Sequence, residues 1–524
     1  MSDQTPRRAE AGTGSGEEWF GQPRGLATLF FTEMWERFSY YGMRGLLILF
    51  MTASVANGGL EFDIAKAGMV YAMYTSFVYL ANLPGGWVAD RILGQRKSVL
   101  YGGIIIALGH FTMAMPALGL PELPMFYSGL VLIVIGTGML KPNISVMVGQ
   151  LYGDADARRD GGFSIFYMGI NIGAFLAPLV TGALGEGISW HLGFGAAGVG
   201  MTLGLVQYVL GKRHLGEAGL HPSTSAEERV QAVRQFRLGT GIVLAVVAGI
   251  VALAGTGVIV LSAEGISNGY GILLGLIVLS LFGWLFSRTY WTDRERKQLY
   301  VIGVLFVVAA LFWSFFEQAG STLNLFAANR TDRVAPDFLQ GILSGVLADG
   351  LFPASWFQSL NALFIVMLAP VFAWLWVWLS KRRKEPTSPG KFVFGLIFLG
   401  LGFAVLAVGA ALSQQGVEVS PNWLIITYLL HTIGELCLSP VGLSAMTKLA
   451  PARIGSLMMG LWFLAVSVGN YMGGFFVKLY ASMELPTLFG AMATFAVAMG
   501  LLLWVLVKPL RQMIERADTD GAAA

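Results

Sequence analysis

Long apolar stretches alternate with short polar breaks, many of them containing glycine or proline, along nearly the whole chain. A helix that crosses the hydrocarbon core of a membrane needs about 20 mostly apolar residues. The pattern therefore predicts an all-α polytopic membrane protein, and the even number of spans places both ends of the chain on one side. The fourteen predicted spans are 25–50, 66–88, 98–118, 125–149, 163–184, 190–210, 239–262, 269–287, 298–323, 356–379, 392–412, 422–447, 456–479 and 486–509.

The composition agrees with this pattern. Of the 524 residues, 55% are hydrophobic and 12% are charged, and the mean hydropathy is +0.66. A soluble globular domain carries roughly 25% charged residues, so one soluble core with a single membrane anchor is excluded. The chain has one cysteine, Cys437. It therefore cannot form an intramolecular disulfide or a cysteine-rich metal site, and we expect no metal centre.

Basic residues gather in every second connection between the spans. Because Lys and Arg accumulate in cytoplasmic loops, these connections are expected in the cytoplasm together with both termini. The basic connections contain Arg91, Arg96, Lys97, Arg158, Arg159, Lys212, Arg213, Arg294, Arg296, Lys297, Lys381, Arg382, Arg383, Lys384, Lys448 and Arg453. The alternate connections are nearly bare, with Lys66, Arg330, Arg333 and Lys478 as exceptions.

The stretch FTEMWERFSYYG, residues 31–42, places charged side chains inside the first apolar span. At about 100° per residue, six polar or aromatic side chains of this span fall within one arc of about 140°. A charge at mid-bilayer costs at least a few kcal/mol, so such groups face a partner or a watered cavity. We therefore expect an inward-facing stripe formed by Glu33, Glu36, Arg37, Tyr40, Tyr41 and Arg44.

Three further charges lie deep in other predicted spans: Lys141 in the fourth, Glu317 in the ninth and Glu435 in the twelfth. Together with the stripe they form a set of mixed sign. A pore that selects ions of one sign favours rings of like charge, whereas mixed charge suits a zwitterion. The simpler alternative is that these groups only form ion pairs that lock helices together.

The loop GGWVADRILGQRK, residues 85–97, resembles the loop between the second and third helices of the major facilitator superfamily. This resemblance implies two six-helix bundles around a central cavity that opens alternately to the two sides, with two additional helices between the bundles. The implied division is a polar cytoplasmic N-terminal tail at 1–23, an N-terminal bundle at 24–210, a cytoplasmic linker with the additional helices at 211–297, a C-terminal bundle at 298–510 and a cytoplasmic tail at 511–524.

Several motifs together resemble the proton-dependent oligopeptide transporter family. The first span contains E-x-x-E-R-F at residues 33–38, with YYG at residues 40–42. Later matches are FSIFYMGINIGAF at 163–175, FFEQAGSTL at 315–323 and WFQSLNALFIVMLAP at 356–370. With the loop motif and the two additional helices, the resemblance covers most of residues 24–480. It implies a proton-coupled symporter that imports di- and tripeptides by alternating access.

The resemblance also implies which side chains face the substrate. Arg37 and Lys141 occupy positions that face the peptide carboxylate, and Glu435 occupies one that meets the amino group. Charge pairing in a partly dry cavity makes this arrangement physically reasonable. The remaining implied binding residues are the hydrogen-bonding Asn171 and Asn361 and the aromatic Tyr41, Tyr79 and Trp462.

A second implied feature is a gate with proton coupling. Arg44 and Glu317 resemble a pair that closes the cavity on the outer side, and their union favours the inward-facing state. Protonation of a carboxylate separates such a pair reversibly. By hypothesis Glu33, Glu36 and Glu317 couple proton occupancy to these ion pairs. The proton gradient then supplies the driving force, and no cofactor is expected.

Other functions remain as alternatives. A symporter of the same fold could carry another small solute, such as nitrate, an amino acid or a peptide-like compound; Glu435 together with E-x-x-E-R and Lys141 favours a zwitterionic peptide. A membrane enzyme would need a nucleophile and base, a metal-ligand cluster or a phosphate loop, and none is apparent, so we expect no enzyme. A scaffold or receptor would not need matched charges in several helices.

The expected partners are di- and tripeptides, protons and the lipid bilayer, without nucleic acid. We expect a monomer. The short tails and the absence of a large outer domain are similar to bacterial members of the family, which predicts a bacterial inner membrane as the location.

Overall fold

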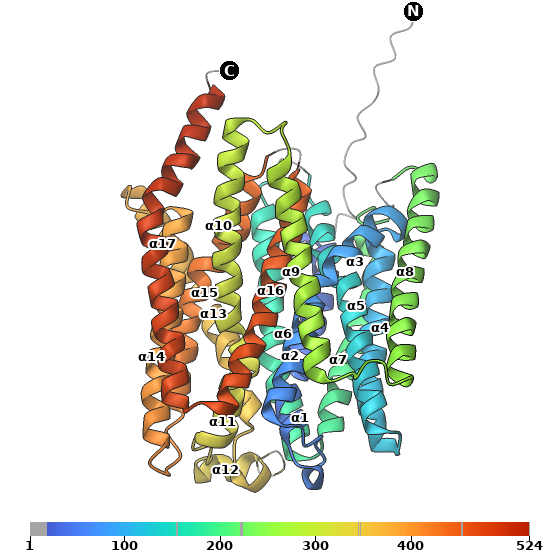
Figure 1. The fold of residues 1–524 in the computed structure, drawn as a ribbon, viewed down its shortest axis with the longest axis vertical. Coiled ribbons are helices and arrows are strands. Elements are labelled where there is room, and N and C mark those ends of the chain that lie inside the picture. The colour runs from blue at the N-terminus through green and yellow to red at the C-terminus, as the bar shows by residue number, and fades with distance from the viewer. Residues whose placement is uncertain are drawn as a thin grey trace, which may run out of the picture.

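The computed structural model describes residues 18–153, 156–220, 224–343, 345, 347–451 and 454–522. Long helices stand side by side and roughly parallel through the molecule (Figure 1). Among the described residues, twelve helices are long and apolar enough to cross a membrane. The chain is therefore a helical, multi-pass membrane protein.

The α-helices are α1 (Gly25–Thr52), α2 (Ile64–Leu80), α3 (Asn82–Val88), α4 (Gln95–Ala114), α5 (Glu122–Gln150), α6 (Arg159–Gly187), α7 (Trp190–Gly211), α8 (Ala226–Gly255), α9 (Ala263–Ser287), α10 (Asp293–Phe316), α11 (Thr322–Arg330), α12 (Asp337–Leu343), α13 (Ser359–Lys381), α14 (Ser388–Ser413), α15 (Asn422–Leu449), α16 (Gly455–Ser482) and α17 (Leu485–Ala522). Short helical turns include η1 (Val55–Asn57), η5 (Glu317–Gly320) and η7 (Ala354–Gln358). Strands β1 (Glu18–Trp19) and β2 (Gln22–Pro23) form an antiparallel hairpin.

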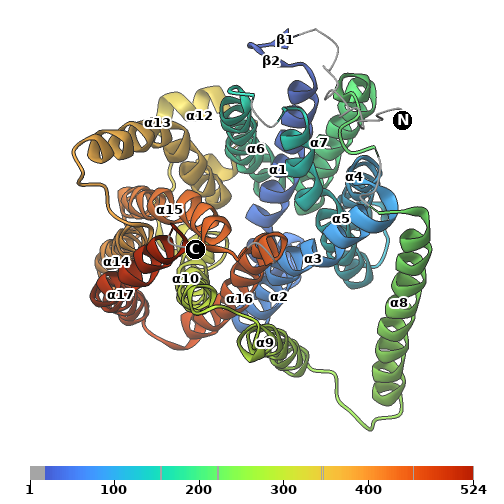
Figure 2. The same cartoon turned by 90° about the horizontal axis from the view of Figure 1, so that it is seen from above.

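The helices pack in two groups. In the N-terminal group, α1 packs on α6 and α7, and α4 packs on α5 and α7. In the C-terminal group, α14 packs on α15 and α17, and α10 packs on α16 and α17. The groups meet where α2 lies against α16 and α6 against α13 (Figure 2). The junction between the groups is therefore lined by helices from both ends of the sequence.

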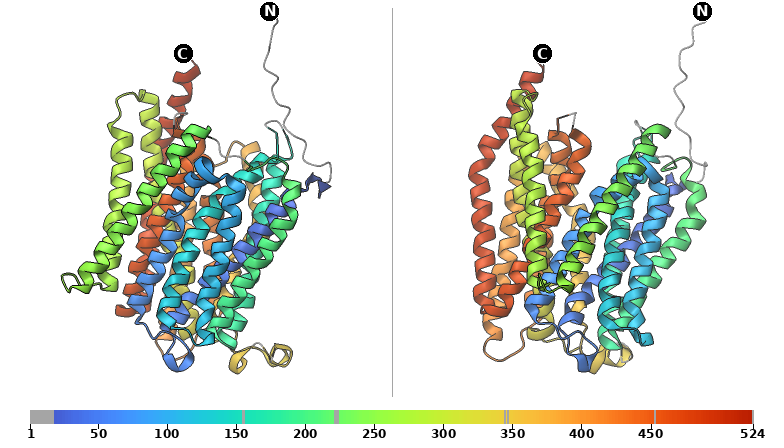
Figure 3. Two further views of the ribbon diagram at one scale, coloured as in Figure 1. Left: turned by 90° about the vertical axis from the view of Figure 1, so that its right-hand side faces the viewer. Right: turned by 45° about the vertical axis from the view of Figure 1, so that its right-hand side comes forward.

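The two ends of the molecule differ. α11 and α12 lie at the lower end in Figure 1, which we call the α12 end. The β1–β2 hairpin lies toward the opposite end (Figure 3). There the Tyr152 hydroxyl donates to Gln22 Oε1 at 3.0 Å, and the Thr28 hydroxyl donates to the Gly211 carbonyl at 3.2 Å. The start of α1 thus lies beside the segment that follows α5 and beside the end of α7.

Two helices stand outside both groups, and one begins earlier than the sequence predicts. α8 starts at Ala226 rather than at the predicted residue 239. Ser225 and Glu228 form a capping box, which begins the helix within a charged stretch that the sequence predicts to be a loop. α8 is exposed over nearly its whole length beside the N-terminal group, whereas α9 packs against α2, α10 and α16 (Figure 2). The Tyr270 hydroxyl of α9 lies 2.6 Å from Ser76 Oγ of α2, and this contact anchors α9.

Two predicted spans are interrupted. The span predicted at 66–88 is divided into α2 and α3, where Pro84 has no N–H to donate to the preceding turn. After this break Gly85 lies so close to α5 that a Cβ there would be 1.9 Å from the Gly138 carbonyl oxygen. The span predicted at 298–323 is divided into α10, η5 and α11, with Ser321 outside helical geometry (φ −128°, ψ −92°).

Two predicted spans are not among the twelve spanning helices, one because its helix is short and the other because its helix is charged. α2 is only 17 residues long, whereas every 18-residue window of α1 contains at least three charged side chains. The prediction of fourteen spans differs from the twelve by these two elements. Elsewhere, the connection predicted at 324–355 contains most of α11 and all of α12, and α17 continues as a helix through the predicted tail to Ala522.

Candidate functional site

Five of the six side chains in the stripe predicted on α1 are buried, and the sixth, Tyr41, is half-buried. Glu33, Glu36 and Arg37 are each exposed by 3% or less. Arg37 Nε lies 3.2 Å from Glu33 Oε1 and also donates to Glu36 Oε2. The spacing explains the first pair, because residues four apart lie on the same face of a helix. With both acids ionised, two carboxylates share one guanidinium, so the trio needs a further positive charge or a proton for balance.

Lys141 of α5 supplies a positive charge next to this trio. It interacts electrostatically with Arg37, Glu36 and Glu33. Its ammonium group lies over the Tyr79 ring of α2, 4.1 Å from the ring centroid, and such cation–π contacts stabilise a desolvated ammonium. Three predicted site residues of α1, Lys141 and Tyr79 therefore belong to one cluster in the N-terminal group.

A second ion pair joins the two groups of helices. Arg44 Nη2 of α1 lies 2.5 Å from Glu317 Oε2 of η5, and each side chain is 6% exposed. Arg44 Nε donates to the Tyr71 hydroxyl of α2 at 2.7 Å. Gly320 makes room for this arrangement, since a Cβ there would lie 1.9 Å from the Tyr71 hydroxyl and 2.9 Å from Arg44 Nε. The pair predicted between Arg44 and Glu317 is thus present as a contact.

Two predicted residues of the C-terminal group contact each other directly. Asn361 of α13 donates through Nδ2 to Glu435 Oε2 of α15 at 2.9 Å and to the Thr432 hydroxyl at 3.1 Å. Both Asn361 and Glu435 are half-buried.

Tyr41 connects the clusters. It interacts electrostatically with Arg37, Arg44, Glu317 and Glu435. The guanidinium carbon of Arg44 lies 5.6 Å from the Tyr41 ring centroid. The structure therefore brings the charges of α1, η5 and α15 around one tyrosine at the junction of the two groups.

Two predicted residues lie at the edge of this arrangement. Asn171 of α6 is buried and donates to the Tyr167 carbonyl of its own helix at 2.9 Å. Trp462 of α16 is buried against Gly442 of α15, where a Cβ would lie 2.5 Å from the indole ring. The Asn171 amide is therefore bonded within its own helix, and the Trp462 ring lies close to Gly442.

Sequence reasoning missed three polar side chains at the junction. These are Tyr71, which bonds Arg44; Asn324, which donates to the Gly45 carbonyl at 2.8 Å; and Glu186, whose carboxylate accepts hydrogen bonds from η7. Tyrosine and asparagine are too common in helices for Tyr71 or Asn324 to be recognised from the sequence. Glu186 carried a signal, because it is an acid in the last turn of an apolar helix.

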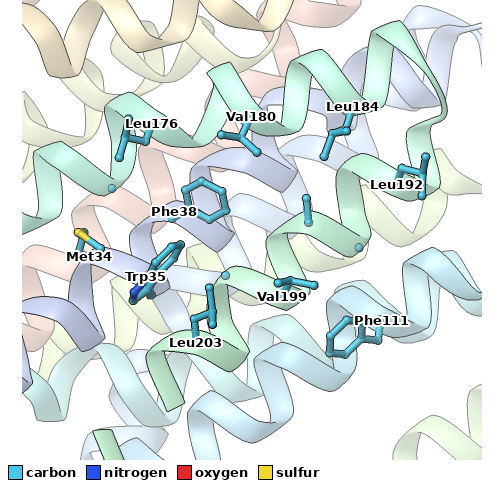
Figure 4. A pocket seen from close by; sticks show the side chains of 14 residues that line it. Met34, Trp35, Phe38, Phe111, Leu176, Val180, Leu184, Leu192, Val199 and Leu203 are labelled. Atoms are coloured by element: carbon cyan, nitrogen blue, oxygen red, sulfur yellow. The ribbon is translucent and has the colours of Figure 1, made fainter. Parts of the chain in front are cut away.

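A separate groove on α1 has a different character. It has a volume of about 660 Å³, and its lining includes Trp35 and Phe38 of α1, Val180 of α6 and Val199 of α7 (Figure 4). The labelled side chains carry no charge. A zwitterion would find no partner there, so the groove is distinct from the charged site on the opposite face of α1.

With this geometry described, the relationship to known proteins can be stated. A sequence model of the POT family matches residues 96–492, which is more than half of the chain. The chain belongs to the POT family. This membership confirms the resemblance to proton-dependent oligopeptide transporters that the motifs indicated.

Individual transporters are similar to this chain over nearly their full length. A peptide transporter of Yersinia enterocolitica subsp. palearctica is 43% identical over 522 residues, covering 98% of this chain and 99% of the relative. A di-/tripeptide transporter of Lactococcus lactis subsp. cremoris is 38% identical and covers 95% and 97% of the two chains. A crystal structure of a POT peptide transporter in complex with sulfate has a TM-score of 0.86 at 41% identity, covering 96% of this chain and 98% of that one.

Proposed function

We propose that this protein is a proton-coupled symporter that imports di- and tripeptides by alternating access. The observation that carries the proposal is the set of buried charges of mixed sign at the junction of the two helix groups. Tyr41 interacts electrostatically with both Arg37 and Glu435, and Lys141 interacts with Arg37. Peptide transporters among the relatives support the substrate class.

The proposed topology has fourteen spans. It adds α1 and the α2–α3 pair to the twelve helices that are apolar enough to cross a membrane. The two helix groups then form the two six-helix bundles, at 24–210 and 298–510, with α8 and α9 as additional helices. The α12 end faces outward and both termini lie in the cytoplasm, in agreement with the basic loops. The membrane is a bacterial inner membrane.

The proposed binding mode fixes both ends of the peptide. Arg37 and Lys141 pair with the carboxylate, and Glu435, held by Asn361, pairs with the amino group. Asn171 contributes hydrogen bonds and Tyr41, Tyr79 and Trp462 form aromatic walls. Because Asn171 donates to the Tyr167 carbonyl of its own helix, the mode requires its amide to turn toward the peptide.

The proposed gate is the Arg44–Glu317 pair. Its partners come from different helix groups, so the pair persists only while the α12 end is closed. Removing one partner of a buried ion pair costs roughly 3–5 kcal/mol, which is enough to reverse a conformational equilibrium. We therefore assign this structure to the inward-facing side of the cycle.

The proposed driving force is the proton gradient, without a cofactor. Glu33, Glu36 and Glu317 are the proton-coupling carboxylates, since each is held next to an arginine. One proton that crosses the membrane with net charge gains about 2.3 kcal/mol per 100 mV, which supports a peptide gradient of roughly fifty-fold. The transporter works as a monomer.

Uptake of labelled dialanine by liposomes containing the purified protein tests this function. With an inward proton gradient and an inside-negative potential, we expect accumulation that an uncoupler abolishes and other dipeptides compete with. Liposomes without protein and liposomes without the gradient are the controls. Gradient-driven uptake of nitrate or free amino acids in place of dialanine would contradict the peptide assignment and support a symporter for another solute.

A further inference from the structure

The carboxylate of Glu186 links the two helix groups at the α12 end. Glu186 lies in the last turn of α6, and η7 leads directly into α13 of the other group. Its Oε2 accepts a hydrogen bond from the Ala354 backbone N–H at 2.7 Å. Its Oε1 accepts one from the Ser355 N–H at 3.0 Å and one from the Ser355 hydroxyl at 2.6 Å. One side chain therefore holds three donors of the facing group.

This link is part of a continuous seam. The Ser359 hydroxyl donates to the Phe175 carbonyl at 2.8 Å, and the Trp356 indole donates to the Leu179 carbonyl at 3.0 Å. Residues 175, 179, 182 and 186 recur at helical spacing on one face of α6. Among these four positions, only 186 carries an ionisable side chain.

Gly182 allows the close approach that the seam needs. A Cβ at this position would lie 2.2 Å from Ser355 Oγ. η7 therefore fits against α6 only because position 182 has no side chain. The approach places the first residues of η7 directly over the Glu186 carboxylate.

All three partners of Glu186 act as donors. A backbone N–H cannot accept a hydrogen bond, so the site is matched to an ionised carboxylate with free lone pairs. Hydrogen bonds to an ionised acceptor are roughly twice as strong as bonds between neutral groups. A proton on Glu186 would therefore weaken the contacts and place an O–H against two backbone N–H groups, and of the three partners only the Ser355 hydroxyl could accept from it.

The surroundings of Glu186 contain two further charged groups. A cavity of about 480 Å³ at the α12 end is lined by Glu186, by Arg333 and Asp349 of the connection between α11 and η7, and by residues near the ends of α1, α6 and α7. Arg333 interacts electrostatically with Glu186, and its Nη1 donates to the Phe352 carbonyl at 2.6 Å. Among the described residues that line this cavity, these three are the charged ones.

We infer that Glu186 is a second outer latch, distinct from Arg44–Glu317, which holds α6 to η7 while ionised and releases it when protonated from the outside. The inference rests on the proposed alternating-access function, which places the α12 end outside. In the inward-facing state both links are closed. Acidification outside then weakens the Glu186 link and allows the two groups to separate at this end.

The test measures the separation directly with a pair of spin labels. The sites are Val55→Cys and Val417→Cys, which are exposed positions at the α12 end of the two groups, and the buried Cys437 is replaced by Ser. The reporter protein also carries Glu317→Gln, so that the outer pair no longer contributes to the pH response. Distances are recorded in lipid nanodiscs between pH 8 and pH 5.

In this reporter we expect the long-distance population to grow on acidification. Adding Glu186→Gln, which mimics the protonated acid, should raise the ratio of open to closed forms at pH 8 by about tenfold and abolish the remaining pH response. Ser355→Ala removes one donor but keeps the carboxylate, so it should increase opening modestly and leave the pH response in place. Glu264→Gln, at an exposed carboxylate that pairs with Lys478, is the matched control and should change nothing.

Equal pH responses with and without Glu186→Gln would overturn the inference. So would an identical loss of pH response in Ser355→Ala, because that result would assign the link a purely structural role. Dialanine uptake by the wild-type protein is measured in parallel. Failed uptake with the expected distance changes would reject the proposed function alone, whereas normal uptake with no effect of Glu186→Gln would reject the latch alone.

Discussion

Buried charges in this protein find their partners in two ways. Glu33 and Arg37 lie one helical turn apart on α1, so their contact persists however the helices move. Arg44 and Glu317 lie in different helix groups and can remain in contact only in one arrangement. An ion pair between the two helix groups breaks when the groups separate. A single substitution in such a pair should therefore change the ratio of the conformational states.

Glu317→Gln should open the α12 end. The substitution keeps the shape of the side chain but removes the charge opposite Arg44, and losing a buried partner costs roughly 3–5 kcal/mol. We expect the longer Val55/Val417 spin-label distance to gain population at pH 8, while the Glu186 link still holds part of the protein closed. Arg44→Ala should act in the same way, and the double variant should add little to either change. Fully additive effects would show that the two residues do not act as a pair.

Glu33→Gln should separate transport from proton coupling. The amide cannot take up a proton, so dialanine accumulation driven by a proton gradient should fall to the level of protein-free liposomes. Exchange of labelled for unlabelled dialanine without a gradient needs no net proton movement and should continue. A Glu33→Gln protein that still concentrates dialanine would remove this residue from the coupling mechanism.

At the scale of elements, interrupted helices supply the junction with its geometry. α10 ends at Phe316. Glu317 lies in the turn η5 that follows, and from there its side chain contacts Arg44 of α1. Gly320 in the same turn lies directly against Tyr71. The break therefore positions both the carboxylate and the space that its partners occupy.

Gly320→Ala should disrupt this turn. The added methyl group would lie 1.9 Å from the Tyr71 hydroxyl, and overpacking of this kind typically costs 1–3 kcal/mol. We expect a lower thermal unfolding temperature in detergent and a larger open population in the spin-label assay. Gly241→Ala on the exposed helix α8, where a Cβ meets nothing within 4 Å, is the matched control and should not lower the unfolding temperature. Equal effects of the two substitutions would contradict the proposed packing role of Gly320.

At the scale of the whole molecule, one membrane topology must fit the two helix groups and the two additional helices together. α9 is anchored to α2 by Tyr270, whereas α8 stands nearly free of other helices. In the proposed topology, the connection between α8 and α9 faces outward and the connection between α13 and α14 faces the cytoplasm.

Labelling of single cysteines on intact cells tests this topology. A membrane-impermeant thiol reagent should modify Val260→Cys, whose native side chain is 88% exposed, without disruption of the cells. It should modify Lys384→Cys only after permeabilisation. The native Cys437 is buried and provides a low background, which the unmodified protein measures. Labelling of Lys384→Cys on intact cells would invert the proposed orientation.

Much of the architecture could be predicted from hydrophobic periodicity, because spanning helices must satisfy their backbone hydrogen bonds internally and so appear as continuous apolar stretches. The early start of α8 was missed because its first turns are charged and lie outside any apolar stretch. The breaks near Pro84 and Ser321 were missed because packing against neighbouring helices decides whether a helix continues there.

For the site, the sequence by itself determined the stripe on α1 and the unusual depth of Lys141, Glu317 and Glu435. Helical spacing and the cost of burying a charge are local properties, so they can be read from residue order. The pairing of Arg44 with Glu317, the bond from Asn361 to Glu435 and the hold of Glu186 on η7 were decided by tertiary structure. Each joins segments far apart in the chain, and only the packing of the two helix groups determines which donor meets which carboxylate.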